Sequence, residues 1–210
     1  MTLCYVTDRK GLAVAPEKQC EALVRGIEIA ARAGVDWIQL REKDLSGRAL
    51  AELLGEAVRR VPAGCRLVLN DRLDVACALG AGGVHLGEES LSVEDAKRLV
   101  GGQNATRDFL VGASTHSLAA ALAAEKAGAD YLVFGPVYAT PSKVRYGPPQ
   151  GIDRLGEVCR AVSLPVLAIG GITVENAPAC RAAGAAGIAA IRLFAEASDL
   201  GAVVEALRRG

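Results

Sequence analysis

The strongest constraint on the fold is a repeated alternation of short apolar runs with longer, alanine-rich helical patterns. Eight such runs occur along the 210 residues, and polar residues follow each of them. The runs lack apolar–polar alternation, which is typical of parallel strands covered on both faces. Strand–helix alternation therefore predicts right-handed β–α–β units and a parallel sheet. The predicted strands are Leu3–Val6, Trp37–Leu40, Arg66–Leu69, Gly83–Leu86, Phe109–Gly112, Tyr131–Phe134, Pro165–Ile169 and Gly187–Ile191.

Eight such units predict an α/β fold of the (β/α)₈ or TIM-barrel type, and 210 residues fit the compact end of that fold. Ala-Gly motifs precede alternate strands, where a helix ends and Gly adopts the left-handed conformation at little cost. No linker or composition break divides the chain, so residues 1–210 form one predicted domain. A doubly wound open sheet is the alternative, but no Gly-rich dinucleotide-binding turn follows the first strand. The predicted helices include Glu17–Ala33, Gly47–Arg60, Ser117–Ala127 and Asn176–Ala182.

Charge and composition exclude several classes of partner. Lys plus Arg and Asp plus Glu both number 24, so no basic surplus exists to neutralise nucleic acid or an anionic membrane. Aromatic residues make up only 4%, too few for nucleic-acid stacking platforms, and no apolar run reaches the length of about 18 residues that spans a bilayer. The N-terminal residues do not resemble a signal sequence. The six cysteines are scattered along the chain, as is typical of free thiols. We expect a cytoplasmic protein without nucleic-acid or membrane partners, and a homo-oligomer is compatible with the sequence.

Polar residues follow every predicted strand, and in a β–α barrel the carboxyl ends of the strands carry the active site. Many of these residues are cations and few are acids, which predicts a pocket for small anions. Gly170-Gly171 after the seventh strand offers bare amide groups ahead of a helix, and Arg192 follows the eighth strand. Both are typical of a phosphate site in this fold, with a tight turn as the alternative for the glycines. The cations at the strand ends are Arg41, Lys43, Arg72, Lys143, Arg145 and Arg192.

Asp71 is a carboxylate placed among these cations. A carboxylate at a strand end can hold Mg²⁺ against a pyrophosphate group, since this metal binds one or two carboxylates together with phosphate oxygens. A salt bridge to Arg72 or to another arginine is the alternative interpretation.

The chain has two histidines. His85 lies inside the fourth predicted strand between Val84 and Leu86, which predicts a packed, hydrogen-bonded side chain. His116 precedes a predicted helix, where a structural or capping role and a catalytic role both remain open.

Seven motifs resemble those of the thiamine-phosphate synthases and of their relatives, the TenI-type thiazole tautomerases. Each motif alone is weak, but their order and their positions at strand ends are specific for this superfamily, with the closer match to the synthases. The resemblance covers nearly the whole chain. The motifs are Gln39–Lys43, Asn70–Arg72, Gly83–Gly87, Ser114–Ser117, Gly128–Tyr131, Gly135–Lys143 and Ala168–Ile172.

The resemblance implies a transferase that joins hydroxymethylpyrimidine diphosphate to a thiazole phosphate, with release of pyrophosphate and with Mg²⁺ as cofactor. Departure of pyrophosphate leaves a ring-stabilised pyrimidine methylene cation, which the thiazole nitrogen captures. The site then has to stabilise leaving-group charge and align the substrates. The implied catalytic residues are Arg41, Lys43, Ser114 and Lys143. Gln39 and Asn70 would help to hold the pyrimidine diphosphate, Asp71 would bind Mg²⁺, and Thr140, Ser142, Gly170 and Gly171 would hold the thiazole phosphate.

The chain departs from the synthase pattern at two positions. Ser90 stands where the synthases usually have an aspartate as second metal ligand. We therefore expect either that Mg²⁺ binds more weakly, or that Glu89 takes the place of the aspartate and contacts the metal through water. Arg192 stands where the synthases tend to have serine. An arginine there can bind the thiazole phosphate in a bidentate manner or obstruct it.

A thiazole tautomerase is the main alternative function. The tautomerases carry a catalytic histidine at the position of Pro136, and proline cannot transfer a proton, although His116 could replace it in a different geometry. A non-catalytic thiazole-phosphate-binding homologue and another phosphate-binding barrel enzyme, such as a sugar-phosphate epimerase, are further alternatives.

Overall fold

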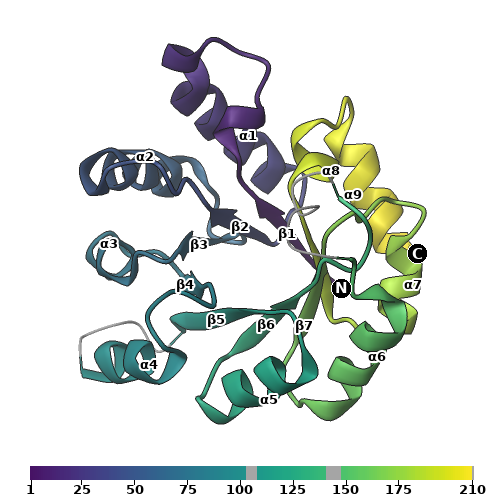
Figure 1. Ribbon diagram of the computed structural model, residues 1–210. Coiled ribbons are helices and arrows are strands. Elements are labelled where there is room, and N and C mark those ends of the chain that lie inside the picture. Colours follow the sequence, from purple (N-terminus) through teal and green to yellow (C-terminus); the bar gives the residue numbers. More distant parts are fainter. Residues whose placement is uncertain (103–107, 141–147, 210) are drawn as a thin grey trace.

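The computed structural model describes residues 1–102, 108–140 and 148–209. Eight parallel strands form a closed barrel in chain order, and β8 pairs with β1. Helices surround the barrel on its outside, as Figure 1 shows. The predicted (β/α)₈ barrel is therefore confirmed. The strands are β1 (Thr2–Val6), β2 (Trp37–Leu40), β3 (Arg66–Asn70), β4 (Gly83–Leu86), β5 (Leu110–Thr115), β6 (Tyr131–Phe134), β7 (Val166–Ile169) and β8 (Gly187–Ala190).

Helices that follow the strands form the outer layer (Figure 1). At the start of α2 and α5, the hydroxyl oxygens of Ser46 and Ser117 accept hydrogen bonds from N–H groups three residues later. Two 3₁₀ turns, η1 (Arg9–Gly11) and η2 (Pro16–Lys18), precede α1. The helices are α1 (Gln19–Arg32), α2 (Gly47–Arg60), α3 (Leu73–Ala78), α4 (Val93–Gly102), α5 (Leu118–Lys126), α6 (Gly151–Ala161), α7 (Ala177–Ala182), α8 (Arg192–Ala195) and α9 (Leu200–Arg209).

Predicted and observed boundaries differ at a few ends. The helix predicted from Glu17 begins at Gln19, because a 3₁₀ turn occupies the preceding residues. Strand β5 extends to Thr115 instead of ending at Gly112, because its last residues continue to pair with β6. Ile191 is the N-cap residue of α8 rather than the last residue of β8.

The wall of the barrel is buried on both faces. Successive side chains of a strand point to opposite faces, and those that point outward pack against the helices, among them the fully buried Leu3, Ile38 and Leu69. Those that point inward form a second cluster inside the barrel. This burial on both faces explains why the strands are continuous apolar runs in the sequence. The inner cluster consists of Cys4, Val6, Tyr131, Val133, Leu167 and Ala189.

The six cysteines are free thiols, and Cys4, Cys65 and Cys180 are buried. Burial raises the pKa of the Cys4 thiol to about 12. Within the part of the chain that the structure describes, every helix is too short or too polar to cross a membrane.

Candidate active site

Polar side chains from neighbouring strands gather near the carboxyl ends of the strands. Gln39 in β2, Asn70 in β3, His85 in β4 and Ser114 in β5 belong to the set of residues that point into the barrel. Gln39 and His85 are buried, whereas Asn70 and Ser114 are partly exposed. The structure therefore brings three of the predicted pyrimidine-site residues, Gln39, Asn70 and Ser114, to one end of the barrel.

Asp71 directly follows β3 and has a positive φ of 65°. Its Oδ1 accepts hydrogen bonds from the Ser90 hydroxyl and from a backbone N–H, and its Oδ2 lies 2.6 Å from the amide nitrogen of Asn70 and 3.4 Å from Nζ of Lys43. Partial burial acts to raise the pKa of Asp71, but the hydrogen bond from Ser90 and the charge of Lys43 outweigh it, so the pKa is lowered. Asp71 is therefore an ionised carboxylate at neutral pH.

Arg72 follows Asp71 and forms an ion pair close to it in the chain. Its guanidinium pairs with Asp74 at 2.6 Å, and it lies close to Gly47 at the start of α2. The Arg72 guanidinium therefore has a carboxylate partner two residues later, and a contribution of Arg72 to the predicted anion pocket stays a prediction. The salt bridge considered between Asp71 and Arg72 is replaced by one between Asp71 and Lys43.

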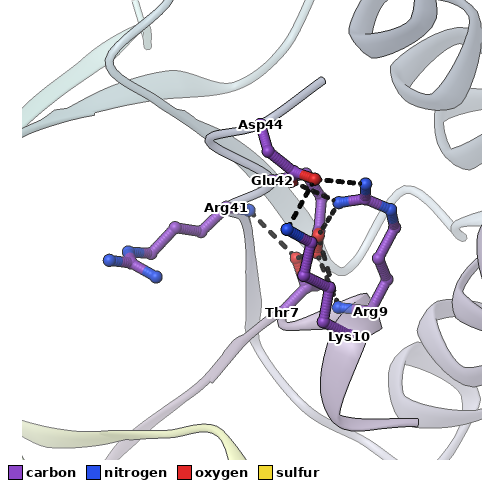
Figure 2. A network of polar contacts seen from close by, with 6 residues as sticks. All are labelled: Thr7, Arg9, Lys10, Arg41, Glu42 and Asp44. Carbon is purple, nitrogen blue, oxygen red and sulfur yellow. Dashed lines mark hydrogen bonds and ion pairs between the residues drawn. The ribbon is translucent and has the colours of Figure 1, made fainter. Parts of the chain in front are cut away.

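Glu42 is a buried carboxylate in a polar network between the loops that follow β1 and β2 (Figure 2). Its Oε1 accepts a hydrogen bond of 2.7 Å from the Thr7 hydroxyl, and its Oε2 lies 3.0 Å from the Arg9 guanidinium. The backbone N–H of Arg9 donates to the same carboxylate. Glu42 and Arg9 are not among the residues predicted from the sequence. The available signal was a carboxylate placed between two cations, Arg41 and Lys43.

Asp44 extends this network toward the surface. Its carboxylate pairs with the Arg9 guanidinium at 2.6 Å and with Nζ of Lys10 at 2.9 Å, and the hydrogen bonds from Arg9 hold the pKa of Asp44 well below its usual range. The Thr7 hydroxyl accepts the N–H of Arg41 at 2.9 Å. Figure 2 shows the Arg41 side chain extending away from the network. The network therefore anchors the backbone of the loop while the Arg41 side chain stays outside it.

His85 lies inside the barrel with 2% of its surface exposed. Its Nδ1 lies 3.1 Å from the Tyr131 hydroxyl and its Nε2 lies 2.8 Å from Oγ of Ser114. Burial lowers the pKa of His85 to about 4, so the ring is neutral at neutral pH. The expectation of a packed, hydrogen-bonded histidine is confirmed. Its contacts to Tyr131 and Ser114 could not be predicted, because they depend on strand register.

Gly170 and Gly171 form the turn after β7, with φ values of 97° and 65°. A Cβ atom on Gly170 would lie 2.5 Å from Cβ of Pro136, and one on Gly171 would lie 2.6 Å from the carbonyl oxygen of Ala139. Close packing against the loop after β6 therefore requires both glycines. This observation supports the tight-turn interpretation, and phosphate binding by the same turn stays a prediction.

The loop after β6 is also held by the residue that follows β5. Nδ1 of His116 contacts the carbonyl oxygen of Gly135, the residue that precedes Pro136. The next residue, Ser117, is the cap of α5. His116 therefore links two neighbouring strand ends and does not itself cap the helix.

The other predicted residues lie at the ends of β4, β6 and β8 or outside the described residues. Glu89 is exposed in the same loop as Ser90, Thr140 is partly exposed, and Arg192 is exposed at the first position of α8. Ser142, Lys143 and Arg145 lie in residues 141–147, outside the described residues.

Asp71 and Ser90 are the predicted metal ligands that the structure brings into contact. Among residues 1–102, 108–140 and 148–209, no three His, Cys, Asp or Glu side chains form a group suited to a metal ion. The candidate ligands are therefore one carboxylate and one hydroxyl. Such a pair is suited to an ion that a phosphorylated substrate also binds.

Comparison with known proteins assigns the chain to a family. A family model described as thiamine monophosphate synthase matches residues 12–194. A thiamine-phosphate synthase from Methanoculleus marisnigri is 46% identical over 182 residues, which cover 86% of this chain and 83% of the relative. Another from Roseiflexus castenholzii is 41% identical over 204 residues, which cover 96% and 84%. The solved structure of a thiamine phosphate pyrophosphorylase from Pyrococcus furiosus matches with a TM-score of 0.79 and 34% identity over 99% of this chain and 94% of that chain. The chain therefore belongs to the thiamine monophosphate synthase family.

Proposed function

We propose that the mouth of this barrel joins hydroxymethylpyrimidine diphosphate to a thiazole phosphate, giving thiamine phosphate and pyrophosphate. In this reaction the bond between the pyrimidine methylene carbon and the diphosphate oxygen breaks, and its electron pair leaves with pyrophosphate. The lone pair of the thiazole nitrogen then forms the new C–N bond. The observation that carries the proposal is the group formed by Lys43, Asp71, Asn70 and Ser114 at one end of the barrel, in a chain of this family.

The cationic side chains would stabilise the leaving group. Arg41 and Lys43, together with Lys143, would bind the diphosphate and offset the negative charge that grows on it as the C–O bond breaks. Gln39, Asn70 and Ser114 would orient the pyrimidine substrate so that the methylene carbon faces the thiazole nitrogen.

The thiazole phosphate would bind at the ends of β6, β7 and β8. The turn Gly170-Gly171 carries no side chains, and Arg192 lies at the end of the neighbouring strand. An exposed guanidinium can bind a phosphate through two parallel hydrogen bonds. Thr140 and Ser142 would supply hydroxyl groups at the same site.

Mg²⁺ fits the donors that the chain offers at Asp71. This metal is usually held by one or two carboxylates together with substrate phosphates and water, and Asp71 is an ionised carboxylate in contact with the Ser90 hydroxyl. When bound there, Mg²⁺ would offset charge on the diphosphate oxygens. Glu89 would take part through water from its exposed position. A cytoplasmic location and a homo-oligomeric state stay predictions.

The tautomerase alternative has less support. Pro136 has no group that transfers a proton. The Nδ1 atom of His116 is already in contact with the Gly135 carbonyl oxygen. The relatives with 46% and 41% identity are both described as thiamine-phosphate synthases.

A two-substrate assay tests the proposed function. We expect the purified chain to form thiamine phosphate and pyrophosphate when both substrates and Mg²⁺ are present, detected by mass spectrometry and by a pyrophosphate assay. Arg41→Ala and Lys43→Ala should each lower kcat/KM by about 100-fold, equivalent to about 2.7 kcal/mol. Arg72→Ala is the matched control, because Arg72 pairs with Asp74 instead.

Two outcomes would contradict the proposal. One is the absence of thiamine phosphate with either order of substrate addition. The other is an equal loss of kcat/KM in the Arg72 and Arg41 variants. Isomerisation of a thiazole carboxylate phosphate in the absence of the pyrimidine would instead support the tautomerase, and saturable binding without turnover would support a binding-only homologue.

A further inference from the structure

Three side chains form a hydrogen-bonded row across β4, β5 and β6. The Tyr131 hydroxyl lies 3.1 Å from Nδ1 of His85, and Nε2 of His85 lies 2.8 Å from Oγ of Ser114. Tyr131 and His85 are each 2% exposed, whereas Ser114 is partly exposed near the carboxyl end of β5. The row therefore leads from the interior of the barrel to the mouth.

Gly112 leaves the space that the contact between Tyr131 and His85 requires. In the strand register His85 is the neighbour of Gly112, and Gly112 is the neighbour of Tyr131. The Tyr131 ring lies across the Gly112 position, so that a Cβ atom there would lie 2.0 Å from the ring. Trp37 packs against the same ring in a T-shaped arrangement, with 4.8 Å between the ring centroids. The backbone and packing therefore direct the Tyr131 hydroxyl toward His85.

The direction of the hydrogen bonds follows from counting protons. Burial raises the pKa of Tyr131 well above its ordinary value, so the hydroxyl keeps its proton. A buried hydroxyl needs an acceptor for that proton. Among the residues that the structure describes, Nδ1 of His85 is the one partner of this hydroxyl. Tyr131 therefore donates, and Nδ1 accepts.

This assignment determines the role of the second ring nitrogen. A neutral imidazole carries one N–H group, so an accepting Nδ1 places the proton on Nε2. The Nε2–H group then donates to Oγ of Ser114. Because Nε2 already carries a proton, the Ser114 hydroxyl cannot donate a hydrogen bond to His85. The hydroxyl can therefore donate to a ligand at the mouth of the barrel, where the carboxyl ends of the strands meet.

We infer that Tyr131 and His85 are positioning residues that make Ser114 an obligatory hydrogen-bond donor toward an anionic oxygen of the substrate. The identity of that oxygen, on the departing diphosphate, rests on the proposed function, whereas the tautomer of His85 does not. With the opposite tautomer, Ser114 would donate to His85 and present only lone pairs to the mouth, which would repel a phosphate oxygen.

The tautomer can be measured directly by ¹⁵N NMR on the full chain. The chain contains only two histidines, so the spectrum holds two imidazole rings, and His116→Gln assigns them. We expect His85 to be protonated at Nε2 and unprotonated at Nδ1. Ser114→Ala should leave this state unchanged, whereas Tyr131→Phe should lower the population of the Nε2–H form. An Nδ1–H ring in the wild type, or an unchanged ring in Tyr131→Phe, would overturn the inference.

A double-mutant cycle measures the consequence for binding. The probe is inorganic pyrophosphate with Mg²⁺, measured by calorimetry. We expect Tyr131→Phe to weaken binding about three- to tenfold, the size of one hydrogen bond, while adding little in a Ser114→Ala background. If Tyr131→Phe weakened pyrophosphate binding equally in the wild type and in Ser114→Ala, Tyr131 would not act through Ser114, and the inference would be overturned.

Tyr5→Phe is the matched control, since it removes the hydroxyl of another buried tyrosine and should change neither the tautomer nor the affinity. A change in either would show that loss of a buried hydroxyl, rather than the row, is responsible. If the two-substrate assay fails while the NMR result holds, the proposed function is wrong but the tautomer assignment stands.

Discussion

Oγ1 of Thr7 donates a hydrogen bond of 2.7 Å to Oε1 of Glu42, and this contact joins the ends of β1 and β2. The same Thr7 oxygen accepts the N–H of Arg41, so one hydroxyl fixes both the carboxylate and the start of the loop. The Glu42 side chain is 2% exposed and pairs with Arg9, whose side chain is 11% exposed. A buried ion pair therefore holds the loop that carries the two predicted diphosphate-binding cations, Arg41 and Lys43.

Removal of this carboxylate should destabilise the protein. Glu42→Ala leaves the Arg9 guanidinium largely buried with one partner fewer, and breaking a buried pair costs about 3 kcal/mol or more. The free energy of unfolding, measured by urea denaturation, checks this expectation. Arg32→Ala is the control, because its exposed pair with Glu28 should change stability by less than about 1 kcal/mol. Similar losses for the two variants would show that Glu42 does not hold the loop.

Gly112→Ala should destabilise the barrel from its interior. The added methyl group would lie 2.0 Å from the Tyr131 ring, and overpacking of this kind costs about 1–3 kcal/mol or more. Gly26→Ala is the matched control, because a Cβ atom on this residue of α1 meets nothing within 4 Å. Alanine in a helix interior should stabilise by about 0.5–1 kcal/mol. A neutral effect of Gly112→Ala would contradict the close approach of the ring.

The stability of the protein should fall between about pH 6.5 and pH 4 in part because of His85. In this range the unfolded histidine binds a proton and the buried ring does not, so the unfolded state binds more protons and the free energy of unfolding decreases as the pH falls. A lowering of the pKa from 6.5 to about 4 corresponds to at most about 3 kcal/mol. Urea denaturation across this range should give a shallower pH profile for His85→Gln than for the wild type. Parallel pH profiles for the two proteins would contradict a lowered pKa of His85 in the folded state.

The cysteines should react at very different rates. Cys4 is 3% exposed inside the barrel and burial raises its pKa to about 12, so little thiolate forms. Cys20 is exposed on α1. Iodoacetamide at about pH 8 should therefore alkylate Cys20 well before Cys4, as followed by peptide mass spectrometry. Both should react after unfolding in concentrated urea. Rapid alkylation of Cys4 in the folded protein would show that the barrel interior is open to the reagent.

Local patterns in the sequence were sufficient to predict the barrel and the end of the barrel at which polar side chains gather. Strand and helix periodicity depends on residues that are close in the chain, and strict alternation of the two leaves few topologies. Because parallel strands end at the same side of a barrel, the polar residues after them were predicted to converge, and Asn70 and Ser114 do so. The prediction was less accurate at element ends, where capping and 3₁₀ turns move a boundary by a few residues.

The partners of individual side chains were decided only by the tertiary structure. Glu42 binds Arg9 from 33 residues away, and Tyr131 meets His85 across Gly112 only because three strands are in that register. Arg72 shows the same limit, since its rotamer pairs it with Asp74, a partner that the sequence did not predict. The sequence by itself determined which residues form most of each strand and which residues follow its carboxyl end, because both depend on residues that are close in the chain. Hydrogen bonds form over about 3 Å, so which groups meet depends on register and rotamers, and these are set only when the whole barrel is packed.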